Sequence, residues 1–214
     1  MIRSSPSRRV VSRRVTVASV LACALVAGPA LAAAPAAEDG MAMGDPKAPV
    51  TVVEYASVGC PHCAAWAREN FPTLKARFVD TGKVRYVLRE MLTGDVPLAQ
   101  GGFLTARCAG PDKYFQVVDA VYRGQGEAVR QGNAYVVLLA IAKDAGLSQE
   151  KFDACLRDEA ANAALEARSD RAAAAGVNAT PAFFVNDASL GNDPDIDTLA
   201  AAIAKASRAH PKRR

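Results

Sequence analysis

Histidine is scarce in this chain of 214 residues, which has only His62 and His210. So few histidines exclude a multi-histidine metal site and a histidine-based catalytic triad. Two large classes of hydrolytic and metal-dependent enzymes are therefore ruled out. The chemistry has to come from another residue type, and cysteine is the candidate.

The N-terminal residues 1–32 have the pattern of a secretory signal peptide. A basic start without acidic residues precedes an apolar run over 15–26, and Ala30 and Ala32 then form an A-x-A cleavage pattern. We expect cleavage after Ala32. An uncleaved membrane anchor is the alternative, because apolar residues continue to Ala37. The pair Arg13-Arg14 also leaves twin-arginine export open beside the general secretory route.

The expected mature chain lacks a strong charge of either sign. Cleavage removes five of the 26 basic residues and none of the 22 acidic ones, so the net charge changes from +4 to −1. There is then no broad basic field, and we expect no nucleic-acid partner. The remaining 33–214 are enough for one domain, or for one domain with an insertion, with a core of its own.

Four cysteines remain after cleavage, because Cys23 leaves with the signal peptide. Cys60 and Cys63 form a CxxC motif, while Cys108 and Cys155 stand alone. An even number in an exported protein favours full pairing, which predicts a Cys108–Cys155 structural disulfide. Two buried free thiols are the alternative. A zinc site made from all four is also possible, but the second CxxC pair of most such sites is missing.

The motif Cys60-Pro61-His62-Cys63 follows the β-rich segment 50–55 and starts a predicted helix. Pro61 suits the first helical turn. Unpaired N–H groups and the helix dipole should lower the pKa of Cys60, and His62 should add to this effect. Cys63, one turn further in, should be more buried. We therefore assign Cys60 as the nucleophile and Cys63 as the resolving thiol. A stabilised Cys60 thiolate makes the disulfide a good oxidant.

Hydrophobic patterning predicts two strand-rich regions separated by a helical block. An Ala/Pro/Gly-rich linker is expected at 33–47, and the helical block runs from 97 to about 175 with no strand pattern inside it. The expected strands are 50–55, 83–90, 181–185 and 188–190. The expected helices include 61–81 with a kink at Pro72, 135–145, a long helix from Gln149, and 195–207.

Two further positions are candidates for the site. Glu54 lies on an otherwise apolar strand, where a buried carboxylate needs a partner or a proton-carrying role. Lys83 and Arg85 are possible partners, and the alternative is that Glu54 faces water. Thr180-Pro181, just before a strand, is an X-Pro pair of the kind that can adopt a cis peptide bond.

Together these motifs resemble the DsbA-like branch of the thioredoxin superfamily. The resemblance extends over about 47–208 and rests on Glu54, on Cys60-Pro61-His62-Cys63 and on Gly176-Val177-Asn178-Ala179-Thr180-Pro181-Ala182-Phe183-Phe184-Val185. It implies an α/β protein with a thioredoxin fold at 48–96 and 176–214, and an inserted all-helical domain at 97–175. A monomer without cofactor or metal is expected.

The resemblance also implies a function. The protein would be a periplasmic thiol:disulfide oxidase that passes its disulfide to newly exported, unfolded polypeptides, and a DsbB-like, quinone-linked membrane protein would reoxidise it. Pro181 would be a cis-proline beside the active disulfide, with Thr180 next to it where substrate backbone can pair, and Glu54 would be the buried acid near the site.

Two departures from the family keep alternatives open. Thr180 stands where the best-known DsbA oxidases have valine, and threonine also occurs there in disulfide isomerases, so a reductase or isomerase of the same fold is the main alternative. Only about fifteen residues are expected between the cleavage site and the first strand, which argues against an isomerase with its own dimerisation domain. Cys108 and Cys155 are absent from the simplest members. A peptide-binding chaperone with an incidental CxxC is the third hypothesis.

Overall fold

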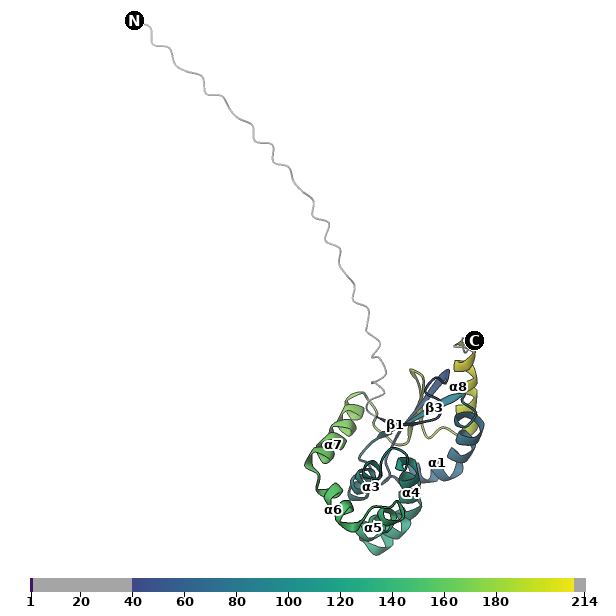
Figure 1. The fold of residues 1–214 in the computed structure, drawn as a ribbon. Helices are drawn as coiled ribbons and strands as arrows, with labels where there is room; N and C mark the ends of the chain where they lie inside the picture. The colour runs from purple at the N-terminus through teal and green to yellow at the C-terminus, as the bar shows by residue number, and fades with distance from the viewer. Residues whose placement is uncertain (2–39, 210–214) are drawn as a thin grey trace. The chain divides into compact units, whose positions relative to one another are not determined.

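The computed structural model describes Met1 and residues 40–209 (Figure 1). The expected signal peptide, with its cleavage site, and His210 lie outside these residues. The described part contains a five-stranded mixed sheet flanked by helices, which confirms the α/β fold class. The strands are β1 (Gly40–Met43), β2 (Val50–Ala56), β3 (Val84–Glu90), β4 (Ala182–Val185) and β5 (Ala188–Asn192).

The sheet has the strand order β1-β3-β2-β4-β5, with β2 in the middle. β2 runs parallel to β3, where Val50 pairs with Val84, and antiparallel to β4, where Val52 pairs with Val185. The outer strands β1 and β5 are antiparallel to their neighbours. A central strand is buried on both faces, which explains why β2 is apolar almost throughout.

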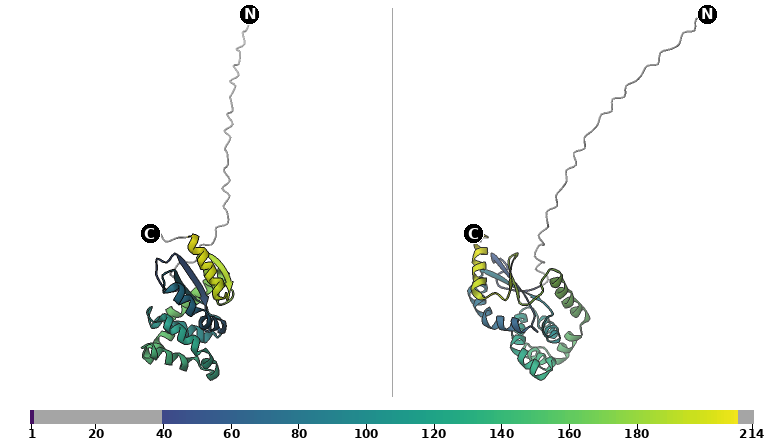
Figure 2. Two further views of the ribbon diagram at one scale, coloured as in Figure 1. Left: turned by 90° about the vertical axis from the view of Figure 1, so that its right-hand side faces the viewer. Right: turned by 180° about the vertical axis from the view of Figure 1, so that it is seen from behind.

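Five helices are inserted between β3 and β4, and they group together on one side of the strands in Figures 1 and 2. They confirm the predicted helical insertion. None of the helices over the described residues is both long and apolar enough to cross a bilayer. The inserted helices are α3 (Val96–Cys108), α4 (Tyr114–Gln131), α5 (Ala134–Asp144), α6 (Gln149–Arg157) and α7 (Glu159–Ala174). The others are α1 (Pro61–Glu69), α2 (Phe71–Leu74), the π-helical turn η2 (Lys75–Val79) and α8 (Ile196–Ala209).

Alternate residues of β2 point to two separate cores. Val52 and Ala56 belong to the larger core, which also contains Trp66 of α1 and Ile203 of α8. Val53 packs on the other face. The second core is smaller and is covered by residues at the end of α7 and after it. This alternation places the Glu54 side chain on the same face as Val52, under α1 and α4.

Three details of the predicted elements are wrong. Residues 40–43 of the expected linker 33–47 form β1, paired with β3, because tertiary pairing overrides a glycine- and methionine-containing segment of weak β propensity. The expected helix 61–81 is interrupted at Asn70. Pro72 lies in the first turn of the new helix, where its missing N–H costs nothing. The expected long helix from Gln149 ends before Asp158, whose carboxylate caps α7 by accepting from the N–H of Ala161 at 3.0 Å.

A buried ionic cluster joins the inserted helices to the sheet. The Glu90 carboxylate at the end of β3 is fully buried and accepts from Nε of Arg107 at 2.7 Å and from Nε of Arg168 at 2.7 Å. The Tyr114 hydroxyl donates to the same carboxylate at 2.8 Å. These partners come from α3, α7 and α4, so one carboxylate connects three helices to one strand.

The structure contains a disulfide between Cys108 and Cys155. It links the last residue of α3 to α6 across a sequence separation of 47 residues. The bond therefore lies entirely within the inserted helices, away from the CxxC pair in sequence.

Candidate active site

Cys60 lies at the junction between β2 and α1. It is the N-cap residue of α1, with an extended backbone (φ −91°, ψ 121°), and its own N–H donates to the Ser57 carbonyl at 3.1 Å. The preceding Gly59 has no room for a side chain, because a Cβ there would lie 2.2 Å from the carbonyl oxygen of Asp95. The loop that carries Cys60 is thus packed directly on the loop before α3.

The environment of Cys60 lowers the pKa of its thiol to about 5. The largest cause is the hydrogen bond from the Cys63 side chain, followed by desolvation, which acts in the opposite direction. The Thr180 side chain and the backbone N–H groups of Cys63 and His62 also favour the thiolate. His62 therefore contributes through its backbone, while its side chain lies exposed on α1.

Cys63 has the opposite environment. It is fully buried, and both thiols are free in the structure. Its hydrogen bond to Cys60, desolvation and the nearby charge of Glu54 raise its pKa far above the ordinary range. One thiol is thus stabilised as an anion and the other as a neutral donor to it. This asymmetry is the expected one between an attacking and a resolving cysteine.

The loop before β4 closes the site on the other side. The Thr180–Pro181 peptide bond is cis, and the Cys60 thiol lies 3.4 Å from the carbonyl oxygen of Thr180. The Thr180 hydroxyl is 2.7 Å from the hydroxyl of Thr93. The carbonyl of Thr180 accepts from the protonated Cys60 thiol, whereas the side chain of Thr180 lowers the pKa of Cys60 and so favours the thiolate.

Two residues of the site have no recognisable signal in the sequence. Gln125 of α4 donates through Nε2 to the carbonyl oxygens of Val58 at 2.7 Å and Cys60 at 3.1 Å. Thr93 connects the loop before α3 to Thr180. Both are ordinary polar residues far from the motif in sequence, and only tertiary packing brings Gln125 to the Cys60 backbone and Thr93 to Thr180.

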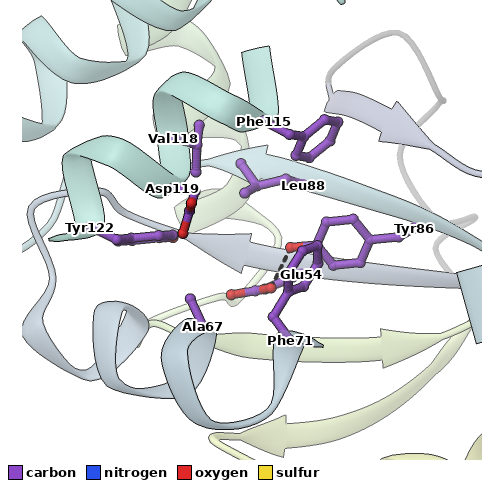
Figure 3. Close-up of a pocket in the computed structure, with 9 residues that line it drawn as sticks. All are labelled: Glu54, Ala67, Phe71, Tyr86, Leu88, Phe115, Val118, Asp119 and Tyr122. Carbon is purple, nitrogen blue, oxygen red and sulfur yellow. Dashed lines mark hydrogen bonds between the residues drawn. The ribbon is translucent and has the colours of Figure 1, made fainter. Parts of the chain in front are cut away.

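Glu54 is buried, with 2% of its surface exposed, so it does not face water. The predicted partners Lys83 and Arg85 are wrong, because the Tyr86 hydroxyl donates to the Glu54 carboxylate at 2.5 Å (Figure 3). Successive side chains of a strand point to opposite faces of the sheet, so residues 83 and 85 point away from the face on which residue 86 meets Glu54. Burial is the main cause that raises the pKa of Glu54 to about 7, and the charge of Asp193 adds to it.

The cysteines are not arranged for a metal. Cys108 and Cys155 are bonded to each other, so they cannot join Cys60 and Cys63 in a zinc site. Over the part of the chain that the structure describes, no group of three or more His, Cys, Asp or Glu residues is placed to hold a metal ion.

Comparison with known proteins assigns the family. The family model described as Thioredoxin matches residues 36–205, and the chain therefore belongs to this family. A Rickettsia conorii protein named as a protein-disulfide oxidoreductase is 36% identical over 171 residues, which are 79% of this chain and 61% of the relative. The chain thus spans about three fifths of the length of that relative. A Bacillus anthracis protein named as disulfide bond formation protein D is 30% identical over 169 residues, or 76% of each chain.

Solved structures give the same assignment. The crystal structure of Wolbachia pipientis alpha-DsbA1 matches with a TM-score of 0.73 and 26% identity, over 80% of this chain and 92% of that one. The chain is accordingly a DsbA-like member of the thioredoxin superfamily, as its motifs indicated.

Proposed function

We propose that this protein is a thiol:disulfide oxidase that introduces disulfide bonds into exported polypeptides. The observation that carries the proposal is the opposite influence of the site on its two thiols, which lowers the pKa of Cys60 to about 5 and raises that of Cys63. A low pKa makes Cys60 a good leaving group, so a mixed disulfide at Cys60 is readily released.

The reaction has two exchange steps. A thiolate of the polypeptide attacks the Cys60 sulfur of the Cys60–Cys63 disulfide, and Cys63 leaves and takes up a proton. The mixed disulfide joins a polypeptide sulfur to the Cys60 sulfur. A second thiolate of the polypeptide then attacks that polypeptide sulfur, and Cys60 leaves as a thiolate. The polypeptide loses two electrons and gains a disulfide, while the protein is reduced to the dithiol. Thr180 and cis-Pro181 supply backbone beside Cys60 on which an extended polypeptide can align.

The compartment and the partners are part of the proposal. The signal-peptide pattern at 1–32 supports export to the periplasm. There the protein acts as a monomer, and a DsbB-like, quinone-linked membrane oxidoreductase reoxidises Cys60 and Cys63. The division at 48–96, 97–175 and 176–214 assigns the redox chemistry to the thioredoxin-fold part and leaves the inserted helices to support the site.

Oxidation of a reduced, unfolded ribonuclease tests this function. The oxidised protein should form disulfides in the substrate stoichiometrically, and Cys60→Ser should abolish the reaction. Thiol trapping in cells should then find the Cys60/Cys63 pair mostly oxidised. A pair that is mostly reduced in cells would instead support the reductase or isomerase function that Thr180 leaves open. Full activity in cells of a protein with both cysteines replaced by serine would support a chaperone.

A further inference from the structure

The loop between β3 and α3, residues 91–95, is fixed by side chains from two other parts of the fold. The hydroxyl of Ser57, which is fully buried, donates to the carbonyl oxygen of Thr93 at 2.8 Å and accepts from the N–H of Thr93 at 3.3 Å. The N–H of Leu92 donates to Oγ of Ser169 on α7 at 3.0 Å. The backbone on both sides of the Thr93 side chain is therefore fixed.

The same loop is packed on the backbone next to Cys60. Gly94 has a φ of +72°, and a Cβ at this residue would lie 2.2 Å from the carbonyl oxygen of Gly59. The N–H of Asp95 donates to that carbonyl oxygen at 3.0 Å. Because the two backbones are in direct contact, the loop 91–95 cannot move without moving the segment that carries Cys60.

The hydroxyl of Thr93 points from this fixed loop to Thr180. The two hydroxyl oxygens are 2.7 Å apart, and either could be the donor. A hydroxyl has one hydrogen to donate and two lone pairs that accept, so the Thr180 hydrogen can point either to Thr93 or elsewhere. Cys60 is the other neighbour of Thr180, since its sulfur lies 3.4 Å from the Thr180 carbonyl oxygen. The direction of the bond between the two threonines therefore decides what Thr180 can offer to Cys60.

We propose that Thr93 is a positioning residue of the exchange reaction, whose hydroxyl donates to Oγ1 of Thr180 and thereby turns the Thr180 hydrogen toward the Cys60 thiolate. A thiolate is an anion without a hydrogen, so it favours the arrangement in which both hydroxyl hydrogens point toward it. Hydrogen bonds in such a chain strengthen one another by roughly 10–30% each. The inference deepens the proposed function and rests on it, because the stabilised thiolate is what makes Cys60 a good leaving group.

The other influences on the thiols come from elements that Thr93 does not belong to. The side chain of Cys63 and the first backbone N–H groups of α1 favour the Cys60 thiolate, and so does the side chain of Thr180. Glu54 of β2 acts on Cys63 through its charge, and Tyr122 of α4 interacts with both thiols. A substitution of Thr93 leaves all of these groups in place. A change in the pKa of Cys60 in such a variant would therefore report the bond between the two threonines.

Thr93→Val tests the proposal, because it removes one hydroxyl at a half-buried position and keeps the branched shape. The measurements are the pKa of Cys60, from the ultraviolet absorbance of the thiolate, and the equilibrium constant for exchange with glutathione. We expect Thr93→Val to raise this pKa by roughly 0.5 pH units, which makes the disulfide roughly threefold weaker as an oxidant at pH 7. Thr93→Ser retains the hydroxyl and should keep both values close to those of the unchanged protein.

Thr105→Val is the matched control. Thr105 is fully buried, and its hydroxyl donates to the carbonyl oxygen of Gly101 at 2.6 Å, within α3. This variant also loses one hydroxyl hydrogen bond, so it should lower the thermal stability while leaving the pKa of Cys60 unchanged. Thr180→Val removes the middle of the proposed chain. When Thr93→Val is added to it, the pKa should therefore not change further.

Three results would overturn the proposal. An unchanged pKa in Thr93→Val would show that its hydroxyl does not act on Cys60, and a lowered pKa would show that Thr180 donates to Thr93 instead. A shift that adds fully to that of Thr180→Val would show that Thr93 acts by another route. If Thr93→Val does not fold, Thr93→Ala compared with Thr93→Ser decides in the same way. The titration needs no polypeptide, so failure to oxidise ribonuclease would refute the proposed function and leave this inference standing.

Discussion

Replacing Cys63 by alanine should raise the pKa of Cys60 in the reduced protein. The hydrogen bond from Cys63 is the largest cause of the low Cys60 pKa, which is about 5 against an ordinary value of 9.0. Removing one hydrogen-bond donor from a thiolate is expected to raise its pKa by roughly 1–2 pH units. The remaining donors at Thr180 and in the backbone of α1 should keep it below the ordinary value.

The same shift predicts how the redox balance depends on pH. The folded-state pKa of Cys60 is depressed, so its contribution to the stability of the reduced protein is complete above about pH 9 and is lost as the pH falls through about 5. At pH 7 the Cys60 thiolate stabilises the reduced protein only through the two pH units between its pKa of about 5 and pH 7. This stabilisation is about 3 kcal/mol before solvent screening and about 2 kcal/mol after it. Relative to an ordinary dithiol, the disulfide is then about 40–60 mV more oxidising.

The assay is a pH titration of the reduced protein, followed by the ultraviolet absorbance of the thiolate. Cys60→Ser is the control and should lose the titration step near pH 5. A Cys60 pKa close to 9.0 would refute both the electrostatic reading of the site and the oxidant strength derived from it. An identical pKa in Cys63→Ala would show that the Cys63 hydrogen bond is not its cause.

Two other perturbations test the buried acids. The pKa of Glu54 is raised to about 7, so ionisation of its carboxyl group destabilises the fold increasingly from about pH 4.5 to 7. Glu54→Gln removes this cost. It should therefore raise the free energy of unfolding by about 2–3 kcal/mol above pH 7 and change it little near pH 4. Urea denaturation at both pH values measures this, and an equal gain at both would refute the pKa assignment. Glu90→Ala should lower the free energy of unfolding by about 3–5 kcal/mol, because it leaves Arg107 and Arg168 unpaired, whereas Arg123→Ala on the surface should change it by less than about 1 kcal/mol. Thermal unfolding compares the two variants, and similar losses would contradict the role of Glu90.

Most elements of the fold could be predicted from local sequence, because β2, β3 and the helical insertion have strong hydrophobic patterns. The errors occurred where local pattern does not decide. β1 forms only because β3 offers an unpaired edge, and the helix expected from Gln149 ends where Asp158 caps a new one. Likewise, Pro72 marked the interruption of 61–81, but the break itself lies at Asn70.

The site was only partly predictable for the same reason. A CxxC motif at a helix start identifies Cys60 and Cys63 because the chemistry depends on residues close in sequence. The partner of Glu54 depends on which residues of the neighbouring strand face it, and in place of the lysine and arginine predicted from that strand the partner is a tyrosine. Gln125 and Tyr122 lie on α4, which no sequence pattern places against β2.

The sequence by itself determined the reactive pair, because spacing, a helix start and a Thr-Pro segment are local features that carry their own chemistry. Tertiary structure alone decided how that pair is controlled. Packing of α4 fixes the backbone of the Cys60 loop, the cis-proline loop brings Thr180 to the Cys60 thiol, and burial sets the pKa of Glu54. Desolvation and hydrogen-bond geometry are properties of residues brought together from distant parts of the chain, so they exist only once the chain has folded.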